Sequence, residues 1–124
     1  MRALGAVMLA LLLTACAQTP AERQQDLSPE QFREYISNDG VFVIDVHIPE
    51  QQHIPGTDAV IPYNELRMQS RSLPDDRDTS IAIYCRSGSM SEEAMQTFKE
   101  MGYTDVVHLE GGLNAWQAAG YEVK

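Results

Sequence analysis

Short apolar runs alternate with amphipathic stretches along most of the chain. Runs suited to buried strands lie at residues 41–45, 59–61, 81–84 and 106–109. Between the strands, apolar residues recur at helical spacing, and the predicted helices cover residues 29–37, 64–69, 89–101 and 114–119. Strands that alternate with helices are typical of a parallel sheet covered on both faces. The pattern therefore predicts one small α/β domain: a small parallel β-sheet flanked by helices on both faces.

Two of the predicted helices have clear terminal signals. Ser28, followed by Pro29 and by Gln31 three residues after the cap, is typical of a helix start with a capping box. Gly102 is expected to end the helix that begins at Ser89.

The first fifteen residues differ in character from the rest. Arg2 precedes an apolar run from Ala3 to Leu13 and then small residues, a pattern typical of a secretory signal peptide and too short for a membrane span. Residues 13–16, Leu-Thr-Ala-Cys, resemble a bacterial lipobox. We therefore expect residues 1–15 to be a lipoprotein signal peptide and Cys16 to be the lipidated N-terminus. An ordinary secreted precursor is the alternative.

Residues 16–26 are polar and predict a tether, which leaves residues 27–124 as the folded domain. Ala17, directly after the lipidated residue, resembles outer-membrane sorting in enteric bacteria. The expected location is the bacterial cell envelope, lipid-anchored and facing the periplasm, at the outer membrane. Which membrane carries the anchor stays open at this point.

The charge balance narrows the choice of partners. The 124 residues carry a formal net charge of −9, and removal of residues 1–15 with Arg2 would leave eight basic residues against eighteen acidic ones. No basic run remains. We therefore expect no nucleic acid partner and no membrane contact other than the lipid anchor.

Cys85 is the strongest candidate for a reactive residue. If Cys16 is acylated, Cys85 is the only thiol of the mature chain. It follows the strand 81–84 and precedes the helix from Ser89, at the carboxyl end of a strand, where open α/β sheets bind ligands. Loop N–H groups and a helix N-terminus favour negative charge, so we expect a thiolate here, with Arg86 adding positive charge. A small buried hydrophobic residue is the alternative interpretation.

Four segments resemble the rhodanese family, in the family's order. Residues 84–91, Tyr-Cys-Arg-Ser-Gly-Ser-Met-Ser, look like its active-site loop, Tyr-Cys-Arg-Ser-Gly-x-Arg-Ser. The other three segments are residues 44–47, 53–62 and 101–121. Together they extend the resemblance over roughly the whole predicted domain.

The resemblance implies a sulfurtransferase. Members of the family move a sulfane sulfur from a donor such as thiosulfate to an acceptor such as cyanide or a thiol, through a persulfide on the loop cysteine. By this resemblance Cys85 is the catalytic nucleophile, and neither a cofactor nor a metal is expected. The partners would be a small anionic sulfur donor and a thiol or cyanide acceptor, a protein thiol among the options. The residues expected to bind the substrate as an anion cradle are Arg86, Ser87, Gly88, Ser89, Met90 and Ser91.

Three departures from the family pattern affect rate and donor choice. Met90 stands where the family often has Arg, which removes a positive charge and predicts a poorer use of thiosulfate. His47 replaces another family Arg, so its usual pairing with a Glu, here Glu50, is expected to be weakened or made by histidine. The stretch between Glu50 and His53 is shorter than usual.

Several alternatives compete with this interpretation. Cys-loop phosphatases of the same fold need Arg six positions after the cysteine, and Ser91 stands there, which excludes that reading. A low-turnover persulfide carrier or a partner-binding rhodanese module stays open. His47, His53, His108 and Asp45 are expected to be scaffold, and a copper site of Met68, Met90, Met95 and Met101 with Cys85 is the less favoured option. The physiological donor and acceptor and the oligomeric state are left open.

Overall fold

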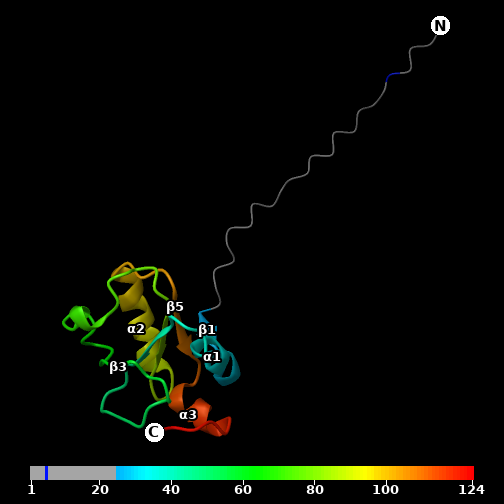
Figure 1. Ribbon diagram of the computed structural model, residues 1–124, viewed down its shortest axis with the longest axis vertical. Coiled ribbons are helices and arrows are strands. Elements are labelled where there is room, and N and C mark those ends of the chain that lie inside the picture. Colours follow the sequence, from blue (N-terminus) through cyan, green and yellow to red (C-terminus); the bar gives the residue numbers. More distant parts are fainter. Residues whose placement is uncertain (1–4, 6–24) are drawn as a thin grey trace.

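The computed structural model describes Gly5 and residues 25–124, and within them one five-stranded parallel sheet (Figure 1). The strand order is β1-β5-β4-β2-β3. The strands are β1 (Asp26–Leu27), β2 (Phe42–Asp45), β3 (Ala59–Val60), β4 (Ile81–Tyr84) and β5 (Val106–Leu109). The helices are α1 (Pro29–Ile36), α2 (Ser89–Glu100) and α3 (Gly112–Ala118), with one 3-10 helix, η1 (Ser70–Ser72). The predicted α/β class is confirmed.

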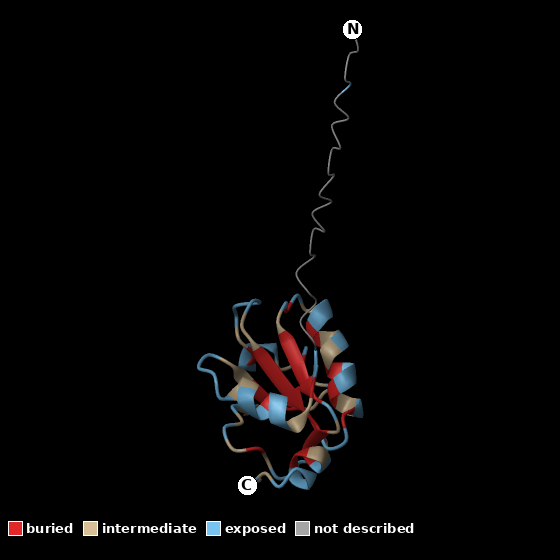
Figure 2. Cartoon of the chain, turned by 90° about the vertical axis from the view of Figure 1, so that its right-hand side faces the viewer, coloured by how far each residue is buried: buried red, intermediate tan, exposed pale blue. Residues whose placement is uncertain are grey.

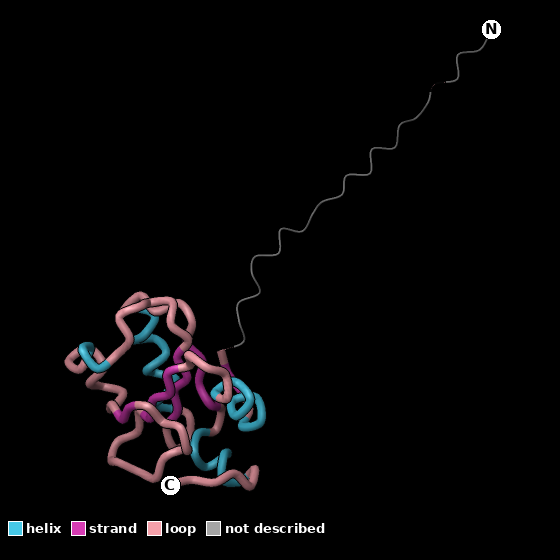
Figure 3. The backbone as a smooth tube through the Cα atoms, viewed as in Figure 1, coloured by secondary structure: helices cyan, strands magenta, loops and turns pink. Residues whose placement is uncertain are grey.

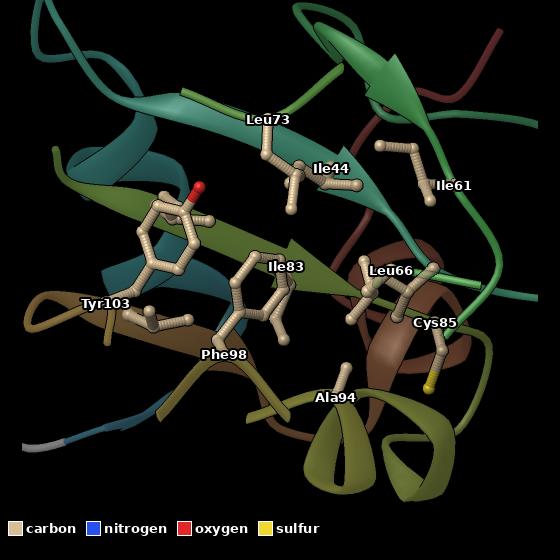
Figure 4. Close-up of a cluster of buried hydrophobic side chains, with 12 residues drawn as sticks. Ile44, Ile61, Leu66, Leu73, Ile83, Cys85, Ala94, Phe98 and Tyr103 are labelled. Carbon is tan, nitrogen blue, oxygen red and sulfur yellow. The ribbon is translucent and has the colours of Figure 1, made fainter. Parts of the chain in front are cut away.

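Alternating side chains of the central strands divide the core into two layers. On one face Ile44 and Ile83 pack with Ala94 and Phe98 of α2, as Figure 4 shows. On the other face the core side chains come from β2, β4, β5 and from helices α1 and α3; they are Val43, Ala82, Tyr84, Val107, Phe32 and Trp116. Figure 2 shows the buried strands between helices whose outer surfaces are exposed. Helices therefore cover both faces, as predicted.

Local sequence signals set several element boundaries. The predicted strands 81–84 and 106–109 agree with β4 and β5 residue by residue. At the start of α1 the Ser28 hydroxyl accepts from the Gln31 N–H, and the Gln31 side chain accepts from the Ser28 N–H. The capping box is therefore present.

Two predicted helices need correction. Residues 64–69 form turns instead of a helix, and η1 follows them, as the loop-rich course of this segment in Figure 3 illustrates. Six residues that bury one large apolar side chain, Leu66, give too little packing to offset helix nucleation. The last helix begins at Gly112, two residues before the predicted start, because its first N–H groups bind the loop after β4.

The sheet also extends further toward the N-terminus than the sequence indicates. Asp26, assigned above to the tether, is the first residue of β1 and pairs with His108 of β5. The Gln25 carbonyl accepts from the His108 N–H at 2.8 Å. This two-residue strand is too short to carry a periodic signal.

The predicted signal peptide apart from Gly5, the predicted lipidation site Cys16 and most of the predicted tether fall on residues outside the described part of the chain. Among the described residues, every helix is too short or too polar to cross a bilayer.

Candidate active site

Cys85 follows β4 directly and lies at the carboxyl end of the sheet. Its side chain is directed toward α2, at one end of the hydrophobic cluster in Figure 4. Only 1% of the residue is exposed, so its sulfur is surrounded by protein atoms.

Backbone N–H groups surround the sulfur. The Gly88 N–H donates to Sγ with an N···S distance of 3.0 Å, and the Ser91 N–H donates to it at 3.4 Å. The Ser91 hydroxyl oxygen lies 3.5 Å from the sulfur. Two N–H donors at the N-terminus of a twelve-residue helix stabilise negative charge on the sulfur. This arrangement suits an anionic sulfur nucleophile.

A tight loop, residues 85–88, brings these donors to the sulfur. Gly88, the residue before α2, has φ +107°, in the left-handed region that favours glycine. A Cβ at Gly88 would also lie 3.3 Å from the Gly111 nitrogen. Both the backbone angle and the close neighbour therefore explain glycine at this position.

The start of α3 holds the same loop from the opposite side. The Leu113 N–H donates to the Cys85 carbonyl at 2.9 Å, and the Asn114 N–H donates to the Arg86 carbonyl at 2.9 Å. A Cβ on Gly112 would lie 2.5 Å from the carbonyl carbon and oxygen of Arg86. Sequence reasoning did not predict this contact; the Gly111-Gly112 pair was the signal that could have indicated it.

The six residues of the predicted cradle do not lie equally close to the sulfur. Gly88 and Ser91 contact it directly, and both are buried. Arg86, Ser87 and Ser89 are exposed. Met90 is half-buried and packs against the cluster on the α2 face.

A second polar cluster lies beside the loop, around Asp45 at the end of β2. Asp45 is buried and accepts hydrogen bonds from the His47 N–H, the Gln51 amide and the His53 ring. The Arg86 Nε donates to the Gln51 oxygen at 3.4 Å, so Gln51 connects this cluster to the Cys85 loop. Sequence reasoning assigned no role to Gln51.

A histidine does pair with Glu50, but it is His53 rather than His47. His53 contacts Asp45 at 2.8 Å and Glu50 at 3.3 Å. Burial lowers the pKa of His53, but hydrogen bonds and charge from Asp45 and Glu50 outweigh that effect, so the net pKa is raised above 6.5. His47 instead places its Nδ1 2.6 Å from the Pro49 carbonyl oxygen.

A profile of the rhodanese-like domain matches residues 28–119. The chain belongs to the rhodanese-like domain family. Among relatives, a sulfurtransferase of Allochromatium vinosum is 34% identical over 87 residues, which is 67% of this chain and 78% of the relative. The thiosulfate sulfurtransferase GlpE of Pseudoalteromonas translucida is 30% identical over 96 residues, covering 75% of this chain and 89% of the relative.

Other similar proteins extend beyond the matched region or are known by structure. The uncharacterized protein slr1261 of Synechocystis is 33% identical over 98 residues, and the match covers 76% of this chain but only 52% of that relative. A rhodanese-related protein from Thermoplasma volcanium has a solved structure with a TM-score of 0.68 and 28% identity, covering 81% of this chain and 97% of the other. The rhodanese-like fold is thus shared, and several relatives are named sulfurtransferases.

The third histidine of this rhodanese-like domain, His108, lies next to α2. Its Nδ1 is 3.0 Å from the Ser91 hydroxyl oxygen, and its Nε2 is 2.6 Å from Oδ1 of Asp26. The period-two alternation of β5 places His108 on the same face as Val106, toward α2. That alternation was the available signal, but Asp26 had none.

A metal site is not supported by the residues that the structure describes. Among them, no group of three His, Cys, Asp or Glu side chains is arranged to hold an ion. Met68, one member of the copper alternative, is 84% exposed, whereas Met90, Met95 and Met101 pack against the core. Hydrophobic packing explains those three methionines.

Proposed function

We propose that the protein is a sulfurtransferase that moves a sulfane sulfur from a donor such as thiosulfate to a thiol or cyanide, through a persulfide on Cys85. The observation that carries the proposal is the pair of N–H groups, from Gly88 and Ser91, that donate to the Cys85 sulfur. Family membership and the sulfurtransferase names of relatives support it.

In the first half of the proposed reaction, the Cys85 thiolate attacks the outer sulfur of thiosulfate. A sulfur–sulfur bond forms on Cys85, the bond to the sulfonate sulfur breaks, and sulfite leaves with the electron pair. The N–H groups of Gly88 and Ser91 stabilise the negative charge of the Cys85 thiolate before the attack. After the attack they lie close to the negative charge of the persulfide. Exposed Arg86, at the loop surface, supplies positive charge for an incoming anion.

In the second half, the acceptor attacks the outer persulfide sulfur. Cyanide would leave as thiocyanate and a thiol as a new persulfide, and in both cases the Cys85 thiolate is regenerated. No external base is needed in either half once the thiolate exists.

The second candidate is a persulfide carrier or partner-binding module with low turnover. Two observations favour it: the family's loop Arg is replaced by Met90, and Cys85 is almost fully buried. Both features would slow exchange with small donors in solution.

For the cellular location, we propose the bacterial envelope, with Cys16 lipidated and the domain facing the periplasm, on the basis of residues 1–17 alone.

Intact mass after incubation with thiosulfate tests the function, with Cys85→Ser as the control and a cyanide assay for thiocyanate in parallel. A gain of one sulfur atom by the wild type only, with repeated thiocyanate release, is expected. A gain without turnover would favour the carrier. No gain on a protein whose thiol still reacts with iodoacetamide would overturn thiosulfate as the donor.

A further inference from the structure

The proton of the Cys85 thiol has a defined neighbour inside the protein. Because only 1% of Cys85 is exposed, bulk water is poorly placed to take that proton. The Ser91 hydroxyl oxygen lies 3.5 Å from Sγ and is itself buried. Within the described residues, Ser91 is therefore the side chain that can accept this proton through a hydrogen bond.

The Ser91 hydroxyl leads on to His108. Asp26 lies 2.6 Å from Nε2 of that ring, and a carboxylate only accepts, so Nε2 must carry a hydrogen. In a neutral ring Nδ1 is then the acceptor, and the Ser91 hydroxyl donates to it at 3.0 Å. The order of bonds is S–H to Ser91, Ser91 to His108, and His108 to Asp26.

The same atoms also satisfy the charged ring. When His108 is protonated, Nδ1–H donates to Ser91, whose own hydrogen turns to the Gly88 carbonyl at 3.0 Å. That carbonyl also accepts the Glu92 N–H at 3.0 Å, so it keeps a partner when Ser91 turns away. Both protonation states of His108 are thus accommodated with every polar group paired.

His108 is itself buried, but its partner Asp26 is largely exposed. A cavity of about 700 Å³ between α2 and the β1–β5 edge is lined by His108 and Asp26. The other charged side chains that line it are Glu92 and Lys99 from α2 and Asp105 before β5. Asp26 has a side chain that is 66% exposed, so a proton on His108 has a short route to water.

We propose that His108, held by Asp26, takes the proton of Cys85 through Ser91. In this step the S–H bond breaks as an O–H bond forms on Ser91, and the original Ser91 proton passes to Nδ1 of His108. The products are a thiolate and an imidazolium paired with the Asp26 carboxylate, with charge and protons conserved. His108 and Asp26 are positioning residues that favour the thiolate, and their role rests on Cys85 being the nucleophile of the proposed function.

Replacement of Asp26 by Asn separates this relay from simple electrostatics by the sign of its effect. Asn keeps an oxygen acceptor for His108 but loses the charge that stabilises the imidazolium, so the relay predicts less thiolate. Direct repulsion alone predicts the opposite, because removal of a nearby negative charge favours a thiolate. The full chain is used, and the readout is the rate of Cys85 alkylation by iodoacetamide as a function of pH.

For Asp26→Asn we expect the midpoint of the alkylation profile to move upward, with alkylation near pH 6 about tenfold slower, equivalent to about one pH unit. His108→Asn should move it in the same direction. The matched control is Glu92→Gln, which removes a carboxylate lining the same cavity and should leave the midpoint unchanged or lower it. Circular dichroism and thermal unfolding confirm that each variant is folded.

An unchanged or lowered midpoint for folded Asp26→Asn would overturn the proposal, whatever His108→Asn does. Since Asp26 is largely exposed, this variant tests the relay even if His108→Asn fails to fold. Alkylation needs no sulfur donor, so a protein that fails to form a persulfide but keeps the upward shift would contradict the proposed function and not the relay.

Discussion

The N–H of Leu113, in the first turn of α3, donates to the carbonyl oxygen of Cys85 at 2.9 Å. The next N–H along the helix, that of Asn114, donates to the Arg86 carbonyl. The start of α3 therefore fixes the backbone of the Cys85 loop, while the Gly88 and Ser91 N–H groups bind the Cys85 sulfur. If Cys85 is the nucleophile that we propose, this backbone support holds its N–H donors in place before a substrate binds.

Gly112→Ala should displace the loop and destabilise the domain. The new methyl group would lie 2.5 Å from the Arg86 carbonyl group, a backbone contact that cannot yield by side-chain rotation. We expect a loss of about 2–4 kcal/mol in the free energy of unfolding, measured by urea denaturation. Sulfur uptake by Cys85 should fall in parallel.

Gly40→Ala is the matched control for that variant. Gly40 also has a positive φ, +84°, but a Cβ there meets no atom within 4 Å. Its expected cost is about 1 kcal/mol, from backbone strain alone. Equal losses for the two variants would show that the contact with Arg86 is unimportant.

Tyr84→Phe should destabilise the protein through a buried N–H group. The Tyr84 hydroxyl accepts the Ile54 N–H at 2.9 Å and contacts the Thr57 hydroxyl at 2.7 Å. Loss of this acceptor leaves the Ile54 N–H unpaired, with an expected cost of about 1–3 kcal/mol in urea denaturation. Tyr63→Phe is the control, because the Tyr63 hydroxyl has no recorded hydrogen bond within the described residues; a similar loss there would contradict the explanation.

Tyr84 should also make the protein sensitive to alkaline pH. Burial raises the pKa of Tyr84 above its ordinary value of 10.0, so the unfolded chain loses this proton at lower pH than the folded one. The contribution of Tyr84 to the free energy of unfolding is therefore fully present well below pH 10 and is lost as the pH rises above that value. Between pH 8 and pH 10.5, the free energy of unfolding measured by urea denaturation should fall less for Tyr84→Phe than for the wild type.

His53→Asn should cost more stability in mild acid than in mild base. The pKa of His53 is raised above 6.5, so its charge stabilises the fold fully below that value and the benefit is lost as the pH rises through the folded pKa. The stability difference from wild type should be larger near pH 6 than near pH 8.5. A nuclear magnetic resonance titration of the ring, with Glu50→Gln as the milder perturbation, measures the shift directly; a difference independent of pH would argue against a charged His53.

Met90→Arg should improve the use of thiosulfate. The substitution restores a positive charge in the first turn of α2, at a half-exposed position beside the Cys85 loop. We expect KM for thiosulfate to fall about two- to fivefold, the size of an exposed charge interaction, and the gain to shrink at high salt. Met68→Arg is the control, because Met68 lies near the far end of α2 from the Cys85 loop: its neighbour Arg67 contacts Glu100, the last residue of that helix. An equal gain for Met68→Arg would indicate a general charge effect.

Agreement between sequence and structure is best where a signal is local. Strands β4 and β5, the capping box of α1 and the start of α2 all follow from patterns within a few residues, and they were predicted correctly. The predicted helix at residues 64–69 is wrong because a six-residue helix is too short to be stable without extensive packing. β1, with two residues, had no pattern to detect.

The sequence by itself determined the parallel α/β architecture and the place of Cys85 at the carboxyl end of a buried strand, since periodicity and the strand–loop–helix order are local properties. Only the tertiary structure decided which residues meet there. Asp26 and His108 lie 82 residues apart in the chain, and Gly112 at the start of α3 lies against Arg86 in the loop after β4. Such contacts depend on strand order and on how closely the helices pack, and these arise from the summed packing of the whole core rather than from any one stretch of residues.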